Sequence, residues 1–263
     1  MWADWLKDPD GMLTIAEFGG VIVGLGKLTL LAPGQWWQEG LRVHPEYQGR
    51  GIASHLHKYQ LDYWTKYGNG ILRLVTNSQR KAVHHLCELF GYAKTAEFTY
   101  FRAQALLEPI PYFHLLELEQ VSAALEFVDP NTSQSESMSF SHGLLDLGWK
   151  KAAPTLQFLE DAVRAGHAWW WQARQGLLTV WIDVDDDGTH TPTIQLLACS
   201  IDQIENILVD FRRLAASLGY AQAAWVAPLH PALLPILEAA GFTRQWDDSL
   251  YLYEKHHPTQ LMV

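Results

Sequence analysis

A short glycine-rich turn is the part of this chain whose residue types most clearly allow chemistry. It reads Gln48-Gly49-Arg50-Gly51-Ile52-Ala53, follows an apolar extended run and opens a segment with helical periodicity. Glycine lets the backbone adopt φ > 0 and approach a ligand closely. The first N–H groups of a helix have no partner within the helix, and together with the helix dipole they bind anions. The turn therefore predicts a cradle for a phosphate group.

The elements around this turn alternate between strand and helix. Apolar runs predict strands over residues 12–18, 21–31, 36–43 and 71–76, with Gly19-Gly20 as a hairpin signal between the first two. Apolar residues at helical spacing predict a helix from Ile52 to about Gly68, and a second helix follows Asn77 and ends at Gly91. A strand over 98–102 closes the series. This alternation predicts an α/β sheet that contains at least one parallel strand pair.

The second half of the chain repeats this order. Strands are predicted over 167–174, 177–184 and 193–198, then a long helix, a strand over 223–227, a helix ending at Gly241 and a strand over 250–254. The serine-rich residues 131–141 predict an exposed loop. Matching element order and spacing indicate two related domains, residues 1–103 and 104–263. Opposite the glycine turn, the second copy reads Ala198-Cys199-Ser200-Ile201-Asp202-Gln203, without glycine and with a carboxylate that would repel phosphate.

The composition of the chain argues against several classes of function. A formal net charge of −10 argues against nucleic acid or an anionic membrane as the main partner, because both favour basic surfaces. It allows a cationic or amine-bearing substrate. The two cysteines, Cys87 and Cys199, lie far apart and predict neither a disulfide framework nor a metal site. This cysteine usage fits a reduced, cytoplasmic setting. No apolar run is long enough to span a bilayer, and no signal peptide is visible.

One acidic run has a partial likeness to a metal site. Residues 183–188, Asp-Val-Asp-Asp-Asp-Gly, copy the first half of an EF-hand loop. The position that should hold the bidentate glutamate is Ile194, and predicted strands rather than helices flank the run. The run therefore predicts a solvated hairpin turn, and we expect no metal cofactor.

Residues 12–102 resemble the GNAT superfamily of N-acetyltransferases. The matching residues are Leu41 and Val43, then His44-Pro45, and the Gln-Gly-Arg-Gly-x-Ala loop at 48–53. Residues 154–254 resemble the family more loosely, through fold and spacing. The resemblance implies two GNAT-like domains of α/β (α+β) type, each a mixed, largely antiparallel sheet with a central parallel strand pair flanked by helices. The first domain would lack the family's initial strand and helices, so we expect either an N-terminally incomplete chain or a substitute from the other domain.

The resemblance also implies a coenzyme and its binding residues. Acetyl-CoA would donate an acetyl group to an amine of a small molecule or peptide. Loop N–H groups would hold the pyrophosphate, the end of the preceding strand would bind the pantetheine arm and polarise the thioester carbonyl, and a residue on the next strand would bind the coenzyme from the other side. The residues implied are Leu41, Arg42, Val43, Gln48, Gly49, Arg50, Gly51, Ile52, Ala53 and Asn77.

Two residues are candidates for proton transfer. Glu39 is the nearest carboxylate on the strand that leads into the loop, where a general base would deprotonate an ammonium group; an exposed strand-edge charge explains it equally well. Cys87 stands where the family often has a tyrosine that protonates the leaving thiolate. A cysteine can donate a proton, but a small buried core residue is the simpler explanation. The alternative function is a coenzyme-A-binding sensor or scaffold without catalysis, which Cys87 and the short N-terminus favour.

Overall fold

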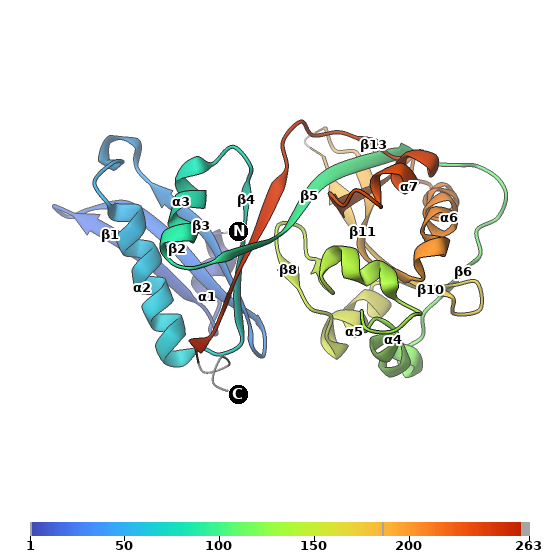
Figure 1. Ribbon diagram of the computed structural model, residues 1–263, viewed down its shortest axis with the longest axis horizontal. Helices are drawn as coiled ribbons and strands as arrows, with labels where there is room; N and C mark the ends of the chain where they lie inside the picture. The colour runs from blue at the N-terminus through green and yellow to red at the C-terminus, as the bar shows by residue number, and fades with distance from the viewer. Residues whose placement is uncertain (1, 186, 259–263) are drawn as a thin grey trace. The chain divides into compact units, whose positions relative to one another are not determined.

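Two compact units make up the computed structural model, which describes residues 2–185 and 187–258 (Figure 1). Unit 1 contains the described residues up to Thr95 and those from Tyr251 onward, and unit 2 contains Ala96–Leu250. This division differs from the expected boundary between residues 103 and 104. The last strand of the chain belongs to unit 1, which no local feature of the sequence indicates.

Unit 1 is a mixed sheet with helices, and its elements follow the predicted order. They are α1 (Trp2–Lys7), the antiparallel strands β1 (Met12–Phe18), β2 (Val21–Ala32) and β3 (Gln35–Val43), the 3-10 helix η1 (Pro45–Tyr47), α2 (Ile52–Tyr67), β4 (Ile71–Asn77) and α3 (Lys81–Leu89). β4 runs parallel to β3. The strand order is β1-β2-β3-β4-β14, where β14 (Leu250–His256) is the last strand of the chain.

A short helix, α1, precedes the first strand, and the initial strand that the resemblance implies does not occur among residues 2–11. The six residues of α1 are too few to show an apolar periodicity, so the sequence carried no signal for it. The other two helices of unit 1 share a core with the sheet. Trp64 of α2 and Cys87 of α3 pack with Leu28, Trp36 and Leu72, and all five side chains are buried. Removing this apolar surface from water is the main force that holds both helices on the sheet.

Polar contacts attach β14 to the rest of unit 1. Arg73 on β4 forms a buried ion pair with Glu254 on β14. Lys255 Nζ donates to Phe90 O at 2.8 Å, next to the end of α3. The partners in these contacts are separated by most of the chain, and they explain why residues 251–258 group with unit 1.

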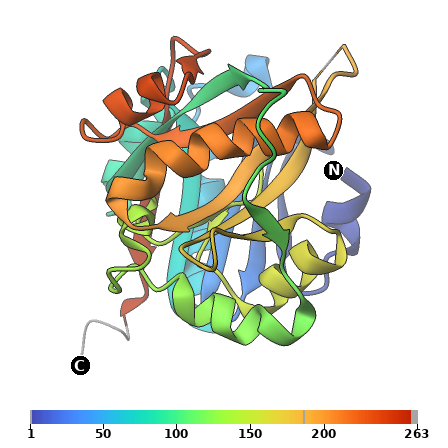
Figure 2. The same ribbon diagram turned by 90° about the vertical axis from the view of Figure 1, so that its right-hand side faces the viewer.

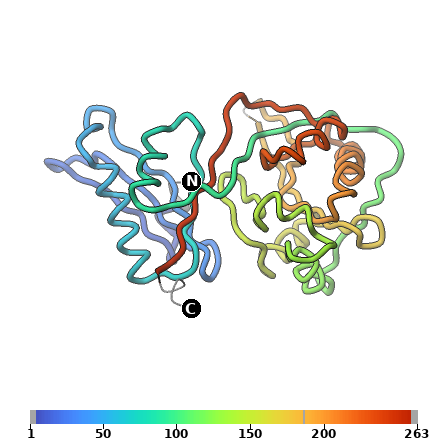
Figure 3. Tube along the Cα trace, viewed as in Figure 1, coloured from blue at the N-terminus to red at the C-terminus, as the bar shows by residue number. Residues whose placement is uncertain are grey.

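Unit 2 repeats the strand–helix order (Figures 2 and 3). β5 (Ala93–Gln104) leads into β6 (Phe113–Leu115), η2 (Leu118–Gln120), α4 (Val121–Phe127), η3 (Glu136–Ser141), β7 (Leu145–Asp146), β8 (Lys151–Ala152) and α5 (Leu156–Arg164). Then follow β9 (Ala168–Trp171), β10 (Gly176–Val184), β11 (His190–Cys199), η4 (Ile201–Gln203), α6 (Ile204–Ser217), β12 (Gln222–Pro228), α7 (Leu234–Ala239) and β13 (Thr243–Arg244). The sheet order is β5-β12-β11-β10-β9-β6, β13 also pairs with β5, and β11 and β12 are parallel.

The serine-rich segment before β7 is only in part the exposed loop that the sequence predicts. Its residues 136–141 form η3, and Ser135, Ser137 and Met138 are buried, while Ser133 and Ser139 are exposed. Its hydroxyls find backbone partners: Ser135 Oγ donates to Asp129 O, and Ser141 Oγ donates to Met138 O at 3.1 Å. A polar segment can be buried when each polar group has a hydrogen-bond partner, which composition alone does not show. No helix among the described residues is long and apolar enough to cross a membrane.

The ion pair between Arg73 and Glu254 gives a test of how firmly β14 belongs to unit 1. The side chains are 6% and 12% exposed, so Glu254→Ala leaves a buried cation without its partner. We expect the free energy of unfolding to fall by about 3–5 kcal/mol, measured by urea denaturation. As a control, Asp62→Ala removes the exposed Lys58–Asp62 pair, whose side chains are 60% and 62% exposed, and should cost about 1 kcal/mol or less. Equal effects of the two substitutions would contradict the structural role of Glu254.

Candidate functional site

β3 and β4 pair only over their first residues and then diverge. Their parallel register ends at Trp37 and Arg73. On its other side, β3 stays paired with β2 as far as Val43. The edge of β3 that faces β4 therefore has no strand partner beyond Trp37 in the described part of the chain. Backbone N–H and C=O groups inside a protein need hydrogen-bond partners, so this opening suits a ligand that carries amides.

A β-bulge lies in this unpaired part of β3. The register with β2 shifts between Leu25 and Lys27, so Gly40 and Leu41 of β3 face a single residue of β2. Gly40 has φ +68°, a conformation that favours glycine. A Cβ atom at Gly40 would lie 2.2 Å from Cη2 of Trp5, so the indole of α1 rests directly on the bulge. A bulge leaves its extra residue outside the ladder, which frees a backbone N–H for another partner.

The glycine turn connects η1 to α2 and has the predicted backbone conformation. Gly49 and Gly51 have φ of +74° and +77°. Gly51 is the N-cap of α2 without a side-chain cap, and His55 N donates the first helical hydrogen bond to Gly51 O at 3.1 Å. The N–H groups of residues 52–54 thus have no partner within the helix. This end of α2 has the geometry of an anion site.

Side chains form hydrogen bonds to the backbone beside the turn and place positive charge near it. Gln48 Nε2 donates to Val43 O at 3.2 Å, and Arg50 Nη2 donates to Glu46 O at 3.2 Å. Arg50 is exposed, as is Arg42 near the end of β3. Two exposed guanidinium groups near the N-terminus of α2 add to its attraction for phosphate.

Unit 2 has no counterpart of this turn. η1 ends at Tyr47 and α2 begins at Ile52, whereas η4 ends at Gln203 and α6 begins at Ile204. The predicted pairing of residues 198–203 with residues 48–53 in the two halves of the chain is wrong. Counting back from the helix ends could not reveal a difference in loop length. In the structure Cys199 ends β11 as Val43 ends β3, and the glycine turn is missing rather than altered.

Asn77 lies at the end of β4, where the sequence analysis expected it. Its side-chain oxygen accepts a hydrogen bond from Gln79 N at 2.8 Å, and its carbonyl oxygen accepts one from Arg80 N at 3.0 Å. The same carbonyl oxygen lies 3.1 Å from Nε2 of His84. Asn77 therefore shapes the turn between β4 and α3 on the other side of the opening.

The two candidates for proton transfer lie in different surroundings. Glu39 is half-buried on β3, beside the bulge, and accepts a hydrogen bond from Thr29 Oγ1 at 3.2 Å. Cys87 is fully buried in the core shared by the sheet and α3. Burial and, second, the charge of Glu88 raise the pKa of the Cys87 thiol to about 12. These surroundings favour packing over proton transfer for Cys87.

A hydroxyl group that the sequence analysis missed lies near the same core. Tyr253 of β14 packs in one cluster with Cys87, and its OH lies 2.9 Å from Nδ1 of His84. Because Asn77 O can only accept, the His84 ring donates from Nε2, and its Nδ1 faces the Tyr253 hydroxyl. Burial and, second, the electrostatic interaction with Cys87 raise the pKa of Tyr253. No sequence signal could have found it, because β14 comes from the far end of the chain.

A hollow beside α2 reaches His55, whose ring contacts Gly51 O of the glycine turn at 2.9 Å. This hollow, of about 450 Å³ in unit 1, is lined by residues 12–16 of β1 and by His55, Leu56 and Tyr59 of α2. β1 is the edge strand, so the hollow lies on the side of α2 away from β4.

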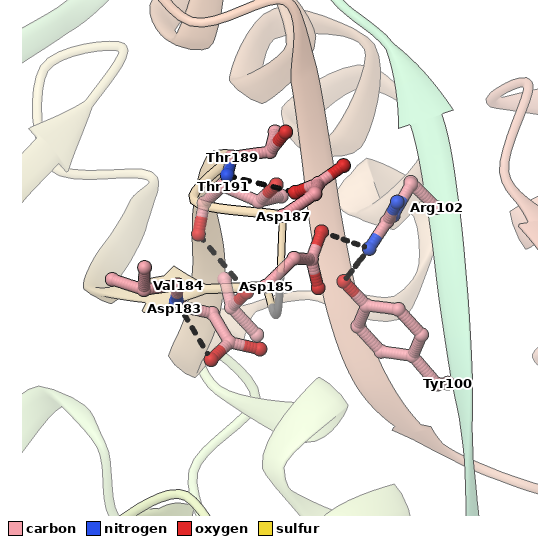
Figure 4. A network of polar contacts seen from close by, with 9 residues as sticks. Tyr100, Arg102, Asp183, Val184, Asp185, Asp187, Thr189 and Thr191 are labelled. Carbon is pink, nitrogen blue, oxygen red and sulfur yellow. Dashed lines mark hydrogen bonds and ion pairs between the residues drawn. The ribbon is translucent and has the colours of Figure 1, made fainter.

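The acidic run in unit 2 is the hairpin turn that the sequence predicts. It joins the antiparallel β10 and β11, and Asp186 lies outside the described residues. Figure 4 shows its carboxylates with separate partners: Asp185 with Arg102 at 3.0 Å, Asp187 with Thr189 N at 2.9 Å and Asp183 with Val184 N at 3.0 Å. Among residues 2–185 and 187–258, no three His, Cys, Asp or Glu side chains come together to hold a metal ion.

Comparison with known proteins agrees with this geometry. Residues 1–92 match the model of the acetyltransferase (GNAT) family. Similar solved structures include a GCN5-related N-acetyltransferase from Sphaerobacter thermophilus (TM-score 0.60, 11% identity, 94% of this chain and 80% of that chain covered). A tandem GNAT protein from the clavulanic acid biosynthesis pathway has a TM-score of 0.55 at 13% identity, with 94% and 83% covered. A GNAT-family acetyltransferase from Colwellia psychrerythraea has a TM-score of 0.51 at 12% identity, with 96% and 89% covered. Curated protein sequences give no match.

Residues 1–92 therefore match the GNAT acetyltransferase family model, and the chain shares the mixed, helix-flanked sheet of the GNAT structures. At these identities the likeness to solved structures concerns the fold. Family and fold together support acyl transfer as the activity and an acetyltransferase as the class of enzyme.

A buried histidine links α2 to the core behind the site. His57 is 2% exposed, and its ring lies 4.8 Å from that of Phe90 and 5.5 Å from that of Tyr92 between centroids. Burial and, second, the charge of Lys255 lower the pKa of His57 from 6.5 to about 4. The ring is therefore neutral in the folded protein at neutral pH.

This lowered pKa predicts acid sensitivity of the fold. The unfolded chain binds a proton at His57 below pH 6.5, but the folded protein does not until about pH 4. Stability from the neutral ring is thus complete above pH 6.5 and falls by up to about 1.4 kcal/mol per pH unit between 6.5 and 4. His57→Phe should flatten this part of the curve of unfolding free energy against pH. Parallel curves for the two proteins would refute this role for His57.

Proposed function

We propose that this protein is an acetyl-CoA-dependent N-acetyltransferase that acts on a primary amine of a small molecule or peptide, with its active site in unit 1. The observation that carries the proposal is the opening between β3 and β4, which combines an unpaired strand edge, a bulge and an uncapped helix N-terminus. These are the three partners that the amides, the thioester carbonyl and the pyrophosphate of the coenzyme require. The family match over residues 1–92 supports it.

The coenzyme would lie along β3 and end at α2. The pyrophosphate would accept hydrogen bonds from backbone N–H groups between Gln48 and Ala53, with Arg42 and Arg50 adding positive charge. The pantetheine amides would pair with the free edge of β3 at Leu41–Val43. The N–H freed by the bulge would polarise the thioester carbonyl and stabilise the oxyanion that forms when the amine attacks. Asn77 would bind the coenzyme from the end of β4.

The acceptor amine would approach at the bulge, beside Glu39 and Trp5. Glu39 is the carboxylate next to the bulge, so we assign it the role of general base that takes a proton from the ammonium group of the acceptor. The formal net charge of the chain is −10, which suits a cationic acceptor. The two free, buried cysteines fit a reducing, cytoplasmic setting.

The leaving thiolate needs a proton, and two groups are candidates to supply it. Both side chains are buried in the same core. Cys87 has the sequence position, whereas the Tyr253 hydroxyl lies 2.9 Å from Nδ1 of His84, which in turn contacts Asn77 O at the end of β4. We therefore favour Tyr253 as the general acid. The tyrosinate formed by proton transfer to the thiolate would regain a proton from water.

A coenzyme-binding module without catalysis is the second candidate function. The observation that favours it is the absence of a tyrosine at position 87, where the family often has its general acid. It predicts binding of the coenzyme without turnover. Unit 2, which has the GNAT strand order but no glycine turn, would be a degenerate second domain under either function.

The glycine turn gives the first test of coenzyme binding. Gly51→Glu places a carboxylate at the proposed pyrophosphate site and should weaken acetyl-CoA binding at least tenfold, since it adds like-charge repulsion. Binding is measured by calorimetry and by thermal stabilisation, which follows RT ln(1 + [L]/Kd). Gly19→Glu is the matched control: Gly19 also has positive φ, +59°, and no atom within 4 Å of an added Cβ, but it lies in the β1–β2 turn. Equal binding by both variants would refute the coenzyme site.

The general acid is tested by a pair of substitutions. Tyr253→Phe should lower kcat about 100-fold in a thiol-release assay with an amine panel, with little change in acetyl-CoA affinity, because only the proton donor is lost. Cys87→Ala should keep kcat within a few-fold of the native value and lower the melting temperature instead. If Cys87→Ala folds and binds but is inactive while Tyr253→Phe is active, the role belongs to Cys87. Binding without turnover in the native chain across the panel would support the silent module.

A further inference from the structure

Unit 2 has the same strand divergence as unit 1. The register of β11 and β12 joins only Thr193 to Ala224 and Ile194 to Trp225. Beyond Ile194 the edge of β11 that faces β12 lacks a strand partner in the described part of the chain. By order of elements, Leu197 and Cys199 of β11 correspond to Leu41 and Val43 of β3, the residues proposed to pair with the pantetheine amides.

In unit 2 these backbone groups are already bound, by the chain itself. Cys199 N donates to Ser137 Oγ at 2.8 Å, and Ser137 Oγ donates to Leu197 O at 3.2 Å. One hydroxyl group thus serves a strand N–H and a strand C=O, as an amide of pantetheine would. η3, which carries Ser137, packs against both β11 and β12.

A carboxylate accepts a hydrogen bond from a backbone N–H group two residues after Cys199. Ile201 N donates to Glu136 Oε2 at 3.5 Å, at the start of η4, the element that leads into α6. By the order of elements, η4 corresponds to η1 of unit 1, which precedes the glycine turn proposed to bind the pyrophosphate. Ser137 is therefore the stand-in for an amide of the coenzyme, and the adjacent Glu136 holds the backbone that follows β11.

The segment is built into unit 2 rather than laid on its surface. Ser137 and Met138 are 5% and 1% exposed, and the Phe140 ring lies 4.7 Å from that of His230 between centroids. Ser139 Oγ donates to Glu136 O at 2.6 Å and Gly143 N donates to Met138 O at 2.8 Å, which fixes the turn of η3. Displacing it would expose Met138 and leave the Cys199 N–H and Leu197 C=O groups without partners.

We propose that residues 136–138 are an internal mimic of the coenzyme, which fills the coenzyme groove of unit 2 so that the chain binds one acetyl-CoA, in unit 1 alone. The correspondence with pantetheine rests on the coenzyme site proposed for unit 1. The occupancy of the groove in unit 2 rests on the contacts of Ser137 and Glu136 and is tested separately.

Hydrogen exchange followed by mass spectrometry, with and without acetyl-CoA, tests both ideas in one measurement on the native chain. For residues 195–203 we expect slow exchange without coenzyme, because Cys199 N is already bonded, and no change when coenzyme is added. For residues 41–53 we expect slower exchange with coenzyme. Fast exchange over 195–203 in the free protein, or added protection there with acetyl-CoA, would overturn the mimic. Absence of protection over 41–53 would count against the coenzyme site of unit 1. The result at 195–203 would still decide whether the groove of unit 2 is filled by the chain itself.

A matched pair of variants isolates the hydroxyl. Ser137→Ala removes the acceptor of Cys199 N, so exchange at that amide should speed up at least tenfold. Ser139→Ala removes a hydroxyl of the same segment that bonds within η3 and should leave exchange over 195–203 unchanged. Equal exchange in both variants would refute the contact of Ser137 with β11. If Ser137→Ala does not fold, the comparison of free and coenzyme-bound native chain still decides the proposal.

Discussion

The divergence of two parallel strands is the constraint on which this structure depends. Strands that pair at one end and separate at the other leave backbone N–H and C=O groups unpaired inside the protein, and such groups need partners. In unit 2 the partner is the Ser137 hydroxyl, on Cys199 N and Leu197 O. In unit 1 the same edge of β3 is the proposed place of the pantetheine arm. One geometric problem thus has two solutions in one chain, an internal side chain and an external ligand.

These two ways of satisfying the strand edge explain why the turn after the strand differs between the units. A pyrophosphate needs several free N–H groups on a backbone without bulk, and unit 1 has Gly49 and Gly51 at positive φ before an uncapped helix. A carboxylate from the chain needs far less room. Unit 2 passes from η4 to α6 without a glycine turn, and Glu136 contacts Ile201 N there. Loss of the turn and gain of the internal segment are consistent with each other physically.

Most of the fold could be predicted from local sequence patterns. The hairpin at Gly19-Gly20, the helix after Gly51 and the strand ending at Asn77 all follow from periodicity and from glycine positions, which report on the local backbone. What could not be predicted depends on contacts between distant residues. Arg73 and Glu254 join strands from opposite ends of the chain, and the burial of Ser137 depends on a strand some 60 residues later. Composition marked that serine-rich segment as exposed, because it cannot show which hydroxyls find partners.

The last strand connects the fold to the chemistry. β14 occupies the place beside β4 and brings Tyr253 next to His84, whose Nε2 contacts the carbonyl oxygen of Asn77. Within residues 1–103 the cluster of Cys87 holds one buried tyrosine, Tyr92, whose hydroxyl donates to Gln38 Oε1 at 3.1 Å. With β14 in place, Tyr253 adds a second hydroxyl to this cluster, and that hydroxyl lies beside His84 instead. The group missing at one position of the sequence can thus be supplied from another, because a sheet is completed by whichever strand pairs with it and not by order along the chain.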